Sequence, residues 1–364
     1  MSAKFPLSLV ISAQDKGALA SLKSLSSQIE RTLKPAAALG KSLTLGVSAP
    51  LAAIGAAGVA AFTRFQTSMA NVSTLIDTNV ESMSDLEAGV MAVTRAVKVK
   101  PLAEMTEALA IARGTGVEAA DQFKVLEGSA KLAVAGLGTT AEAVNMVVAS
   151  MNAWNLKGKE AEGVYNTIFQ AANKGGATLS QLVQGFGSNA SIVASAGVKL
   201  DEYLASVAAM TTTMRPASEA HTQLKSVITG LTAQSETAAA VFRRLNVKSF
   251  KELIATTGGL VPALEKVRGV IKDNDKHLLN AVGGGEAFAA VLDLTGARAG
   301  SFKDTLAAMR SGMDGVGEAY EKQAKTTAAA MQNMRNNMES VAISIGRVVA
   351  PVFERLAPMI EAAT

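Results

Sequence analysis

Histidine is the side chain that most often serves as an acid, a base or a metal ligand near neutral pH, and this sequence contains only two. His221 lies in SEAHTQLK and His277 lies in DNDKHLLN, and neither belongs to an HExxH pair or another ligand spacing. We therefore expect both histidines at a helix surface or a helix end. The chain has no cysteine, which excludes disulfides, thiolate metal ligands and a cysteine nucleophile.

The glycine-rich stretch AVGGGEAF, residues 281–288, is the nearest approach to a phosphate-binding loop. A Walker loop needs Lys and then Ser or Thr after its last glycine, whereas Gly285 is followed by Glu286, whose carboxylate would repel a phosphate. A glycine break before a helix is the better interpretation. No GxSxG motif occurs, and the Asp and Glu pairs are typical of solvated helix faces. The sequence predicts no catalytic, cofactor-binding or metal site, and no enzyme.

The composition favours helices. Hydrophobic residues make up 49% of the 364 residues but aromatic residues only 4%, and helices pack well with Ala, Leu and Met whereas strands favour aromatic and β-branched residues. Charged residues make up 18%, below the roughly 25% of ordinary soluble domains, which indicates surface hidden in an assembly. The net charge of +4 is scattered without a basic run, so we expect no specific nucleic-acid binding.

Helix starts and stops recur along the chain at short intervals. Four pairs fit the capping box, in which a hydroxyl caps the helix and an acid or amide reaches back: Ser84 with Glu87, Thr139 with Glu142, Thr178 with Gln181, and Ser249 with Glu252. Four helix-cap glycines precede an apolar residue, as in the Schellman motif: Gly116, Gly136, Gly197 and Gly259. The sequence therefore predicts an all-α fold, a compact stack of αα-hairpins.

The two ends differ from the middle, and three parts are predicted. Residues 1–64 form an N-terminal arm, with a possible short strand at 4–11, where apolar residues alternate, and an amphipathic helix at 15–34. Residues 65–310 form the helical core, and residues 311–364 form a C-terminal helix of coiled-coil type.

The stretch GVSAPLAAIGAAGVAAF, residues 46–62, lies in a segment without charge between Lys41 and Arg64. The segment is long enough to cross a bilayer, but Ala and Gly dominate it. Small residues stand four apart, a spacing that lets helix backbones approach closely: Ala52, Ala53, Ala56, Ala57, Ala60 and Ala61. We interpret it as a packing helix, with insertion into a host membrane as the alternative.

A heptad pattern runs through the C-terminal part. Apolar residues alternate at spacings of three and four, the period of a coiled coil: Met331, Met334, Met338, Val341, Ile345, Val348 and Val352. We interpret them as an oligomerisation seam. The alternative is an amphipathic helix that packs on its own domain.

Several stretches resemble, in order, the conserved core of phage tail tape measure proteins. They cover about residues 60–360 and include FQTSMANVSTL, GTGVEAADQFKVLEGSAKLAVAGLGTTAEAVNMVVASMNAW, GGATLSQLVQGFGSNASIVASAGVKLDEYLASVAAMTTTM, HTQLKSVITGLTAQ and RVVAPVFERLAPMI. Two places depart from the family pattern. Residues 164–166 stand where an Asp is common, and residues 214–216 stand where a glycine turn is usual.

The resemblance implies a structural, all-helical protein inside the tail tube of a phage or a phage-like injection machine. Such proteins are commonly trimers that set tube length during assembly in the host cytoplasm and leave the virion on infection. The implied partners are further copies of the chain, tail tube and baseplate hub proteins, tail assembly chaperones and, during ejection, the host membrane. A membrane-active, pore-forming helical protein, based on residues 42–63, is the alternative function.

Overall fold

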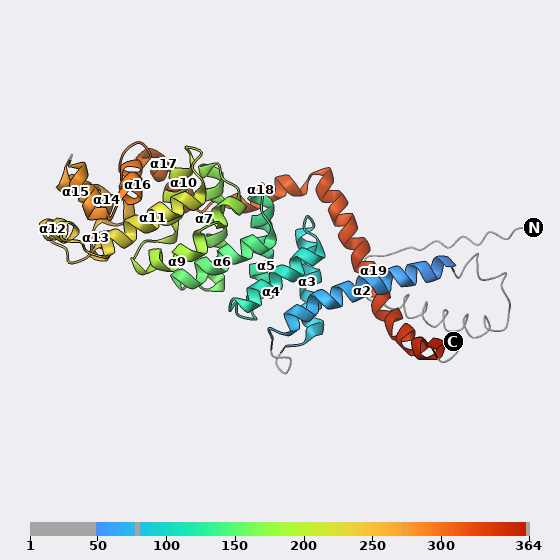
Figure 1. The fold of residues 1–364 in the computed structure, drawn as a ribbon. Helices are drawn as coiled ribbons and strands as arrows, with labels where there is room; N and C mark the ends of the chain where they lie inside the picture. The colour runs from blue at the N-terminus through green and yellow to red at the C-terminus, as the bar shows by residue number, and fades with distance from the viewer. Residues whose placement is uncertain (1–48, 77–80, 273, 362–364) are drawn as a thin grey trace, which may run out of the picture. The chain divides into compact units, whose positions relative to one another are not determined.

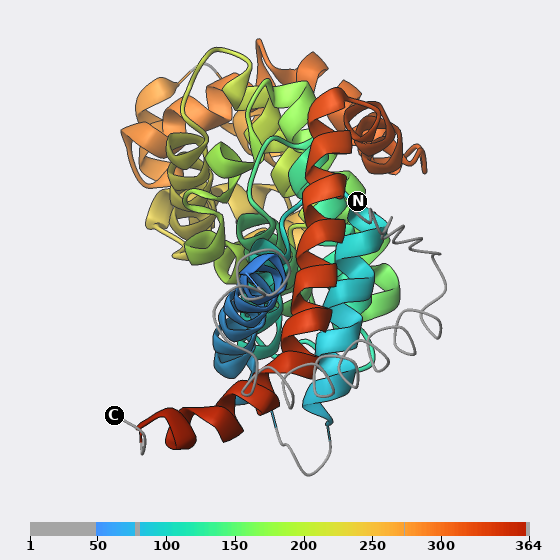
Figure 2. The ribbon, with the colours of Figure 1, turned by 90° about the vertical axis from the view of Figure 1, so that its right-hand side faces the viewer.

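The structure is a computed structural model that describes all residues except 1–48, 77–80, 273 and 362–364 (Figures 1 and 2). The chain divides into two units. We call residues Asn71–Asn333 the core unit, and residues Met1–Ala70 with Met334–Thr364 the arm unit. Side chains are described from residue 58 to residue 351. The strand predicted at 4–11 and the helix predicted at 15–34 lie outside the described residues.

The described part of the chain is built from α-helices with one short 3-10 helix, η2, and contains no strand, so the all-α prediction is confirmed. The arm unit takes most of its described residues from α2, Ala49–Ser73, and α19, Thr327–Glu361. The helices of the core unit are α3 (Met83–Val97), α4 (Leu102–Gly114), α5 (Gln122–Ala135), α6 (Thr140–Trp154), η2 (Gly158–Glu160), α7 (Ala161–Gly175), α8 (Leu179–Val183), α9 (Phe186–Ser195), α10 (Leu200–Thr211), α11 (Ala217–Thr232), α12 (Glu236–Arg244), α13 (Phe250–Thr257), α14 (Leu260–Ile271), α15 (Asp275–Val282), α16 (Gly285–Thr295), α17 (Ala299–Arg310) and α18 (Gly315–Ala324).

Local side-chain chemistry explains several helix starts. The Thr139 hydroxyl accepts the N–H of Glu142 at 3.2 Å, and the Glu142 carboxylate accepts the N–H of Thr139 at 2.8 Å. The same reciprocal pair caps α8, and the Ser249 hydroxyl accepts the first-turn N–H of Glu252 in α13. The fourth predicted box is wrong, because α3 begins at Met83 and Ser82 is its N-cap residue.

The last helices of the core unit fold back onto earlier helices, and a surface groove lies where they meet. Successive helices pack as the chain advances, α5 on α3, α4 and α6, and α10 on α7 and α11. Then α17 packs on α10 and α7, and α18 packs on α5 and α7, so the last helices of the unit lie beside much earlier ones (Figure 1). The predicted boundary at residue 310 therefore falls between two helices of the same unit.

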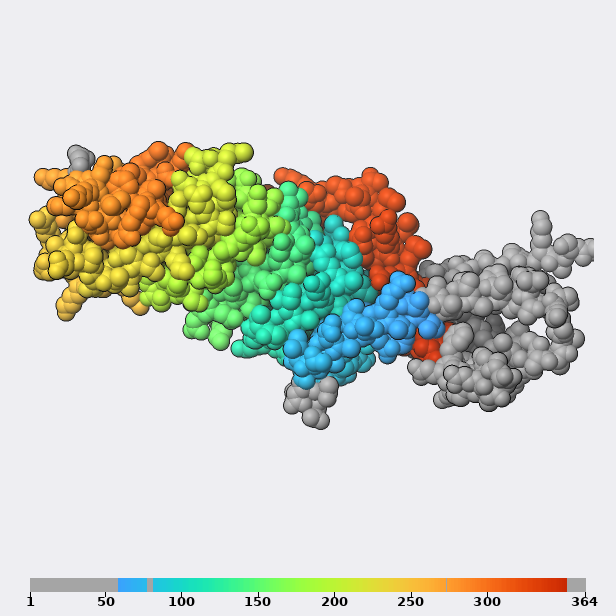
Figure 3. Space-filling model, viewed as in Figure 1, coloured from blue at the N-terminus to red at the C-terminus, as the bar shows by residue number. Residues whose placement is uncertain are grey.

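Small aliphatic side chains dominate the buried interior of the core unit. Ala, Val and Leu supply most of the buried apolar residues, and few aromatic rings join them. Small side chains let the helices of the unit approach one another closely. The space-filling view shows one outer face of these packed helices (Figure 3). A core of this kind depends on glycine and alanine at the tightest crossings.

Candidate functional site

The described residues contain no group of three or more Asp, Glu or His side chains that could hold a metal ion. His277 is exposed at the start of α15, as predicted, but the surface position predicted for His221 is wrong. His221 lies on α11 with an exposed fraction of 0%. Its ring centroid lies 5.9 Å from that of Phe186 and 5.3 Å from that of Tyr203.

The hydrogen bonds of His221 define its tautomer. The Nε2 atom lies 3.0 Å from the carbonyl oxygen of Leu182, which can only accept, so Nε2 carries the proton. The Nδ1 atom then accepts the hydroxyl proton of Tyr203. Burial lowers the pKa of His221 to about 4, against a smaller opposing effect of the bond to Leu182. The ring is a neutral, fully bonded member of an apolar cluster and not a catalytic base.

A buried carboxylate ties three helices of the core unit together. Glu202 on α10 accepts the N–H of Leu260 at the start of α14 at 3.1 Å, and Arg310 at the end of α17 lies 3.5 Å from it. Arg310 also binds Asp201 at 2.6 Å. Burial raises the pKa of Glu202, and the neighbouring charge of Asp201 raises it further. The cluster positions helices and leaves no carboxylate pair free for acid–base chemistry.

Four apolar side chains on α19, which we call the apolar stripe, face solvent. Their exposed fractions are between 41% and 65%, and they are Met331, Met334, Met338 and Val341. The buried residues Asn336 and Ile343 lie on roughly the opposite side of α19, at 3.6 residues per turn. The four residues of the apolar stripe therefore lie away from the buried side chains of α19. Of the remaining members of the predicted seam, Ile345 and Val348 are half-buried, and the Val352 side chain lies outside the described ones.

The helix of the uncharged stretch, α2, makes a close crossing with α19 inside the arm unit. A Cβ atom on Gly346 would overlap the carbonyl oxygen of Gly58, and one on Gly58 would lie 3.0 Å from Cγ2 of Ile345. The Arg347 guanidinium lies 5.9 Å from the centroid of the Phe62 ring. The half-buried state of Ile345 follows from this crossing.

The contact described at that crossing is made by Gly58, and only two of the six predicted alanines have described side chains. Ala60 is exposed and Ala61 is half-buried, while the side chains of Ala52, Ala53, Ala56 and Ala57 lie outside the described ones. The stretch predicts that a small residue approaches another helix closely. Gly58 makes such an approach to α19.

Among the helices of the described chain, none is by itself both long enough and apolar enough to cross a membrane. One bent pair, α5 with α6 at 118°, satisfies the criterion by length and composition only. Both helices carry many side chains that are buried inside the core unit, as helices of a protein interior do.

The four predicted cap glycines fall into two groups. Gly116 and Gly197 have φ values of +90° and +85°, and the apolar residue after each is buried. At the other two helix ends a residue next to the predicted glycine adopts the left-handed conformation. Leu137 does so instead of Gly136, with φ +56°, and Gly258 does so instead of Gly259, with φ +81°. Leu137 is 66% exposed and does not pack back on its helix.

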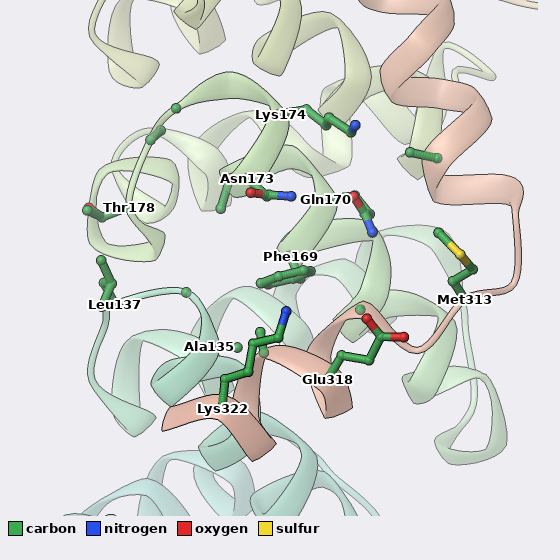
Figure 4. A pocket seen from close by; sticks show the side chains of 17 residues that line it. Ala135, Leu137, Phe169, Gln170, Asn173, Lys174, Thr178, Met313, Glu318 and Lys322 are labelled. Atoms are coloured by element: carbon green, nitrogen blue, oxygen red, sulfur yellow. The ribbon is translucent and has the colours of Figure 1, made fainter. Parts of the chain in front are cut away.

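That exposed leucine borders a groove that sequence patterns did not indicate. The groove has a volume of about 670 Å³ and lies between α7, the turns after α5 and α7, and the segment from α17 to α18. Phe169 lies on its floor, and the amides of Gln170 and Asn173 extend from α7 into the space (Figure 4). From α18, Glu318 and Lys322 enter from the other side (Figure 4). Met313 is 61% exposed at its edge.

The groove joins residues that are far apart in the sequence. It requires α18 to return to α7, and no local signal in either helix predicts that contact. The sequence pattern at Gly136 predicted a helix cap, and the exposure of Leu137 at the edge of the groove was not predicted.

Comparison with known proteins identifies the family. The profile described as phage-related minor tail protein matches residues 97–288, which run from the last residue of α3 into the first turn of α16. The "Probable tape measure protein" of Clostridium phage phiCD119 is 26% identical over 332 residues, with 88% of this chain and 34% of that protein covered. The "Tape measure protein" of Pneumococcus phage Dp-1 is 23% identical over 327 residues, with 87% and 28% covered. No solved structure matches.

The core unit is an all-α domain in the described residues. The chain belongs to the family of phage-related minor tail proteins, among the tail tape measure proteins. It spans about a third of the length of the curated relatives it matches.

Proposed function

We propose that this chain acts as the core part of a tail tape measure. In this proposal several copies associate in the lumen of the tail tube, set its length during assembly in the host cytoplasm, and leave the virion when the genome is ejected. Its role is structural and not catalytic. Tail tube proteins, baseplate hub proteins and assembly chaperones are its proposed partners.

The apolar stripe on α19 is the observation that supports association of the copies. Exposed methionines in a heptad pattern lose hydration when they meet a copy of themselves, at about 25 cal/mol per Å² of apolar area buried. The stripe lies away from the buried face of α19, so the helix can pack in its own unit and still present the stripe to other chains. From Met331 to Val341 the apolar stripe is about 15 Å long, at a rise of about 1.5 Å per residue.

The proposal is tested by electron microscopy of tails assembled in infected cells. Without this protein, infected cells should assemble no tails, or tails of variable length. The variant Met338→Asp should cause the same defect, because it places a charge in the middle of the seam, whereas Ser344→Asp, away from the seam, should give tails of normal length. Tails of uniform, normal length with Met338→Asp would contradict a role for the stripe in assembly.

A further inference from the structure

Tyr165 on α7 carries a buried hydroxyl that lacks a hydrogen-bond partner among the described residues. The exposed fraction of the residue is 7%, and its hydroxyl oxygen is buried and unpaired. The phenol end of the ring lies against Gly128 of α5, since a Cβ atom on Gly128 would lie 2.8 Å from the Tyr165 hydroxyl oxygen. A buried hydroxyl that is left unpaired destabilises the fold, so a ligand group that bonds to it is favoured.

Tyr165 lines a second hollow in the surface of the core unit. It has a volume of about 430 Å³ and lies where α5, α7 and α18 pack on one another (Figure 1). We call it the acidic pocket, because more carboxylates than ammonium groups line it: Glu127, Glu162, Asp314 and Glu321 against Lys124 and Lys131. Lys131 is already bound to Glu127 at 2.7 Å. The pocket therefore has an excess of negative charge.

The negative charge reaches the phenol and is not neutralised by the described part of the chain. Burial raises the pKa of Tyr165, and the charges of Asp121, Glu127 and Glu162 raise it further. Glu162 and Glu321 are exposed, and no Lys, Arg or His side chain among the described residues forms an ion pair with either of them. The pocket thus favours a cation that comes from outside the described residues.

The chemistry of the lining favours an organic cation over a metal ion. In the part of the chain that the structure describes, no three acidic or histidine side chains lie close enough together to hold one metal ion. An ammonium or guanidinium group carries several N–H donors, so it can bond to the Tyr165 hydroxyl oxygen and to separate carboxylates at once. The ring of Tyr320 also lines the pocket, and aromatic rings attract such cations.

We propose that the acidic pocket binds an organic cation, whose ammonium or guanidinium group donates to the Tyr165 hydroxyl oxygen and to the carboxylates of Glu162 and Glu321. The hydroxyl is covered in the unbound pocket, so an exposed side chain of the lining, such as Lys124, moves aside as the cation enters. A Lys or Arg side chain of a partner protein and a free polyamine both carry this chemistry. The inference does not depend on the proposed role in the tail, because it concerns binding by the isolated chain.

The tyrosines of the full chain provide a direct test by nuclear magnetic resonance. The chain has three, of which Tyr165 and Tyr320 line the pocket and Tyr203 lies beside His221. With isotope-labelled tyrosine rings, spermidine and the peptide acetyl-Gly-Arg-Gly-amide are titrated separately. The same peptide with citrulline in place of arginine is the neutral control. We expect the resonances of Tyr165 and Tyr320 to move with a cationic probe, and that of Tyr203 to stay unchanged.

Variants separate a role in binding from a role in folding. Tyr165→Phe should weaken binding at least about fivefold, as measured at Tyr320. It should be at least as stable as the parent in denaturant unfolding, because its lost hydroxyl has no described partner. Glu162→Gln should weaken binding at least about threefold. Glu236→Gln, which removes an exposed carboxylate on α12 outside the pocket, should bind as the parent does.

The two probes also distinguish the source of the cation. A response to the arginine peptide supports a basic side chain of a partner protein, and a response to spermidine alone supports a free polyamine. Resonances of Tyr165 and Tyr320 that stay unchanged with both probes would overturn the proposal. So would an equal response to the citrulline peptide, or an unchanged affinity of Tyr165→Phe.

Discussion

At the scale of single residues, the best-defined environment is that of His221. The local sequence SEAHTQLK is polar, which favoured a surface position. The spacing of the buried residues in α11 contained a better signal, because Ala217, Ala220, Leu224 and Ile228 place His221 on the buried face. A titratable ring that is buried, neutral and hydrogen-bonded on both nitrogens makes stability depend on pH.

The sign of this dependence follows from the lowered pKa. The pKa of His221 is about 4 in the folded protein and 6.5 without the fold, so the unfolded chain binds the proton first as the pH falls. The contribution is complete above about pH 6.5 and is lost progressively toward pH 4, by about 3 kcal/mol in all. Denaturant unfolding at pH 7 and at pH 4.5 should show this loss.

The variant His221→Gln isolates the contribution of the histidine. Its amide can donate to Leu182 and accept from Tyr203 but does not titrate between these pH values. Glu202 is also buried, and its raised pKa stabilises the folded protein at low pH, an effect that is lost as the pH rises. This effect is the same in the parent and in the variant. A parent and a variant whose free energies of unfolding fall equally between pH 7 and pH 4.5 would refute the assignment.

At the scale of helices, the closest contact that the sequence did not indicate is made by Gly230. A Cβ atom at this position of α11 would overlap the backbone carbonyl of Val282 at the end of α15. Backbone atoms cannot rotate away as a side chain can, so Gly230→Ala should push α15 from α11 and destabilise the core unit by about 1–3 kcal/mol. Thermal unfolding monitored by circular dichroism measures the effect.

Gly269→Ala is the matched control. It is also a helical glycine, in α14, but a Cβ atom there would have no neighbour within 4 Å. Alanine favours a helix over glycine by about 0.5–1 kcal/mol, so this variant should be at least as stable as the parent. A Gly230→Ala protein as stable as the Gly269→Ala protein would show that the crossing of α11 and α15 tolerates a methyl group.

These cases show which features the sequence predicts and which it does not. Caps such as Thr139 with Glu142 depend on residues three positions apart, so the helix class and several helix starts follow from local chemistry. The contact of Gly230 with Val282, and the groove between α7 and α18, depend on residues that are distant in the chain. Helix ends moved by one residue, as at Gly136, because Leu137 itself adopts the left-handed conformation there.

At the scale of the whole molecule, self-association decides whether the apolar stripe is functional. If copies meet along Met331, Met334, Met338 and Val341, each chain buries a Met338 side chain, which contributes about 1.5–3 kcal/mol. Met338→Asp removes this burial and brings like charges together in an apolar seam. Association should therefore weaken by at least about tenfold, without loss of helix content.

Light scattering of the parent, Met338→Asp and Ser344→Asp at tens of micromolar tests this prediction. Ser344 is exposed on the same helix but lies outside the stripe, so Ser344→Asp adds the same charge and should associate as the parent does. Circular dichroism of each protein separates a loss of association from a loss of folding. A parent that is monomeric at these concentrations, or a Met338→Asp protein that associates normally, would mean that the stripe is covered by something other than its own copies.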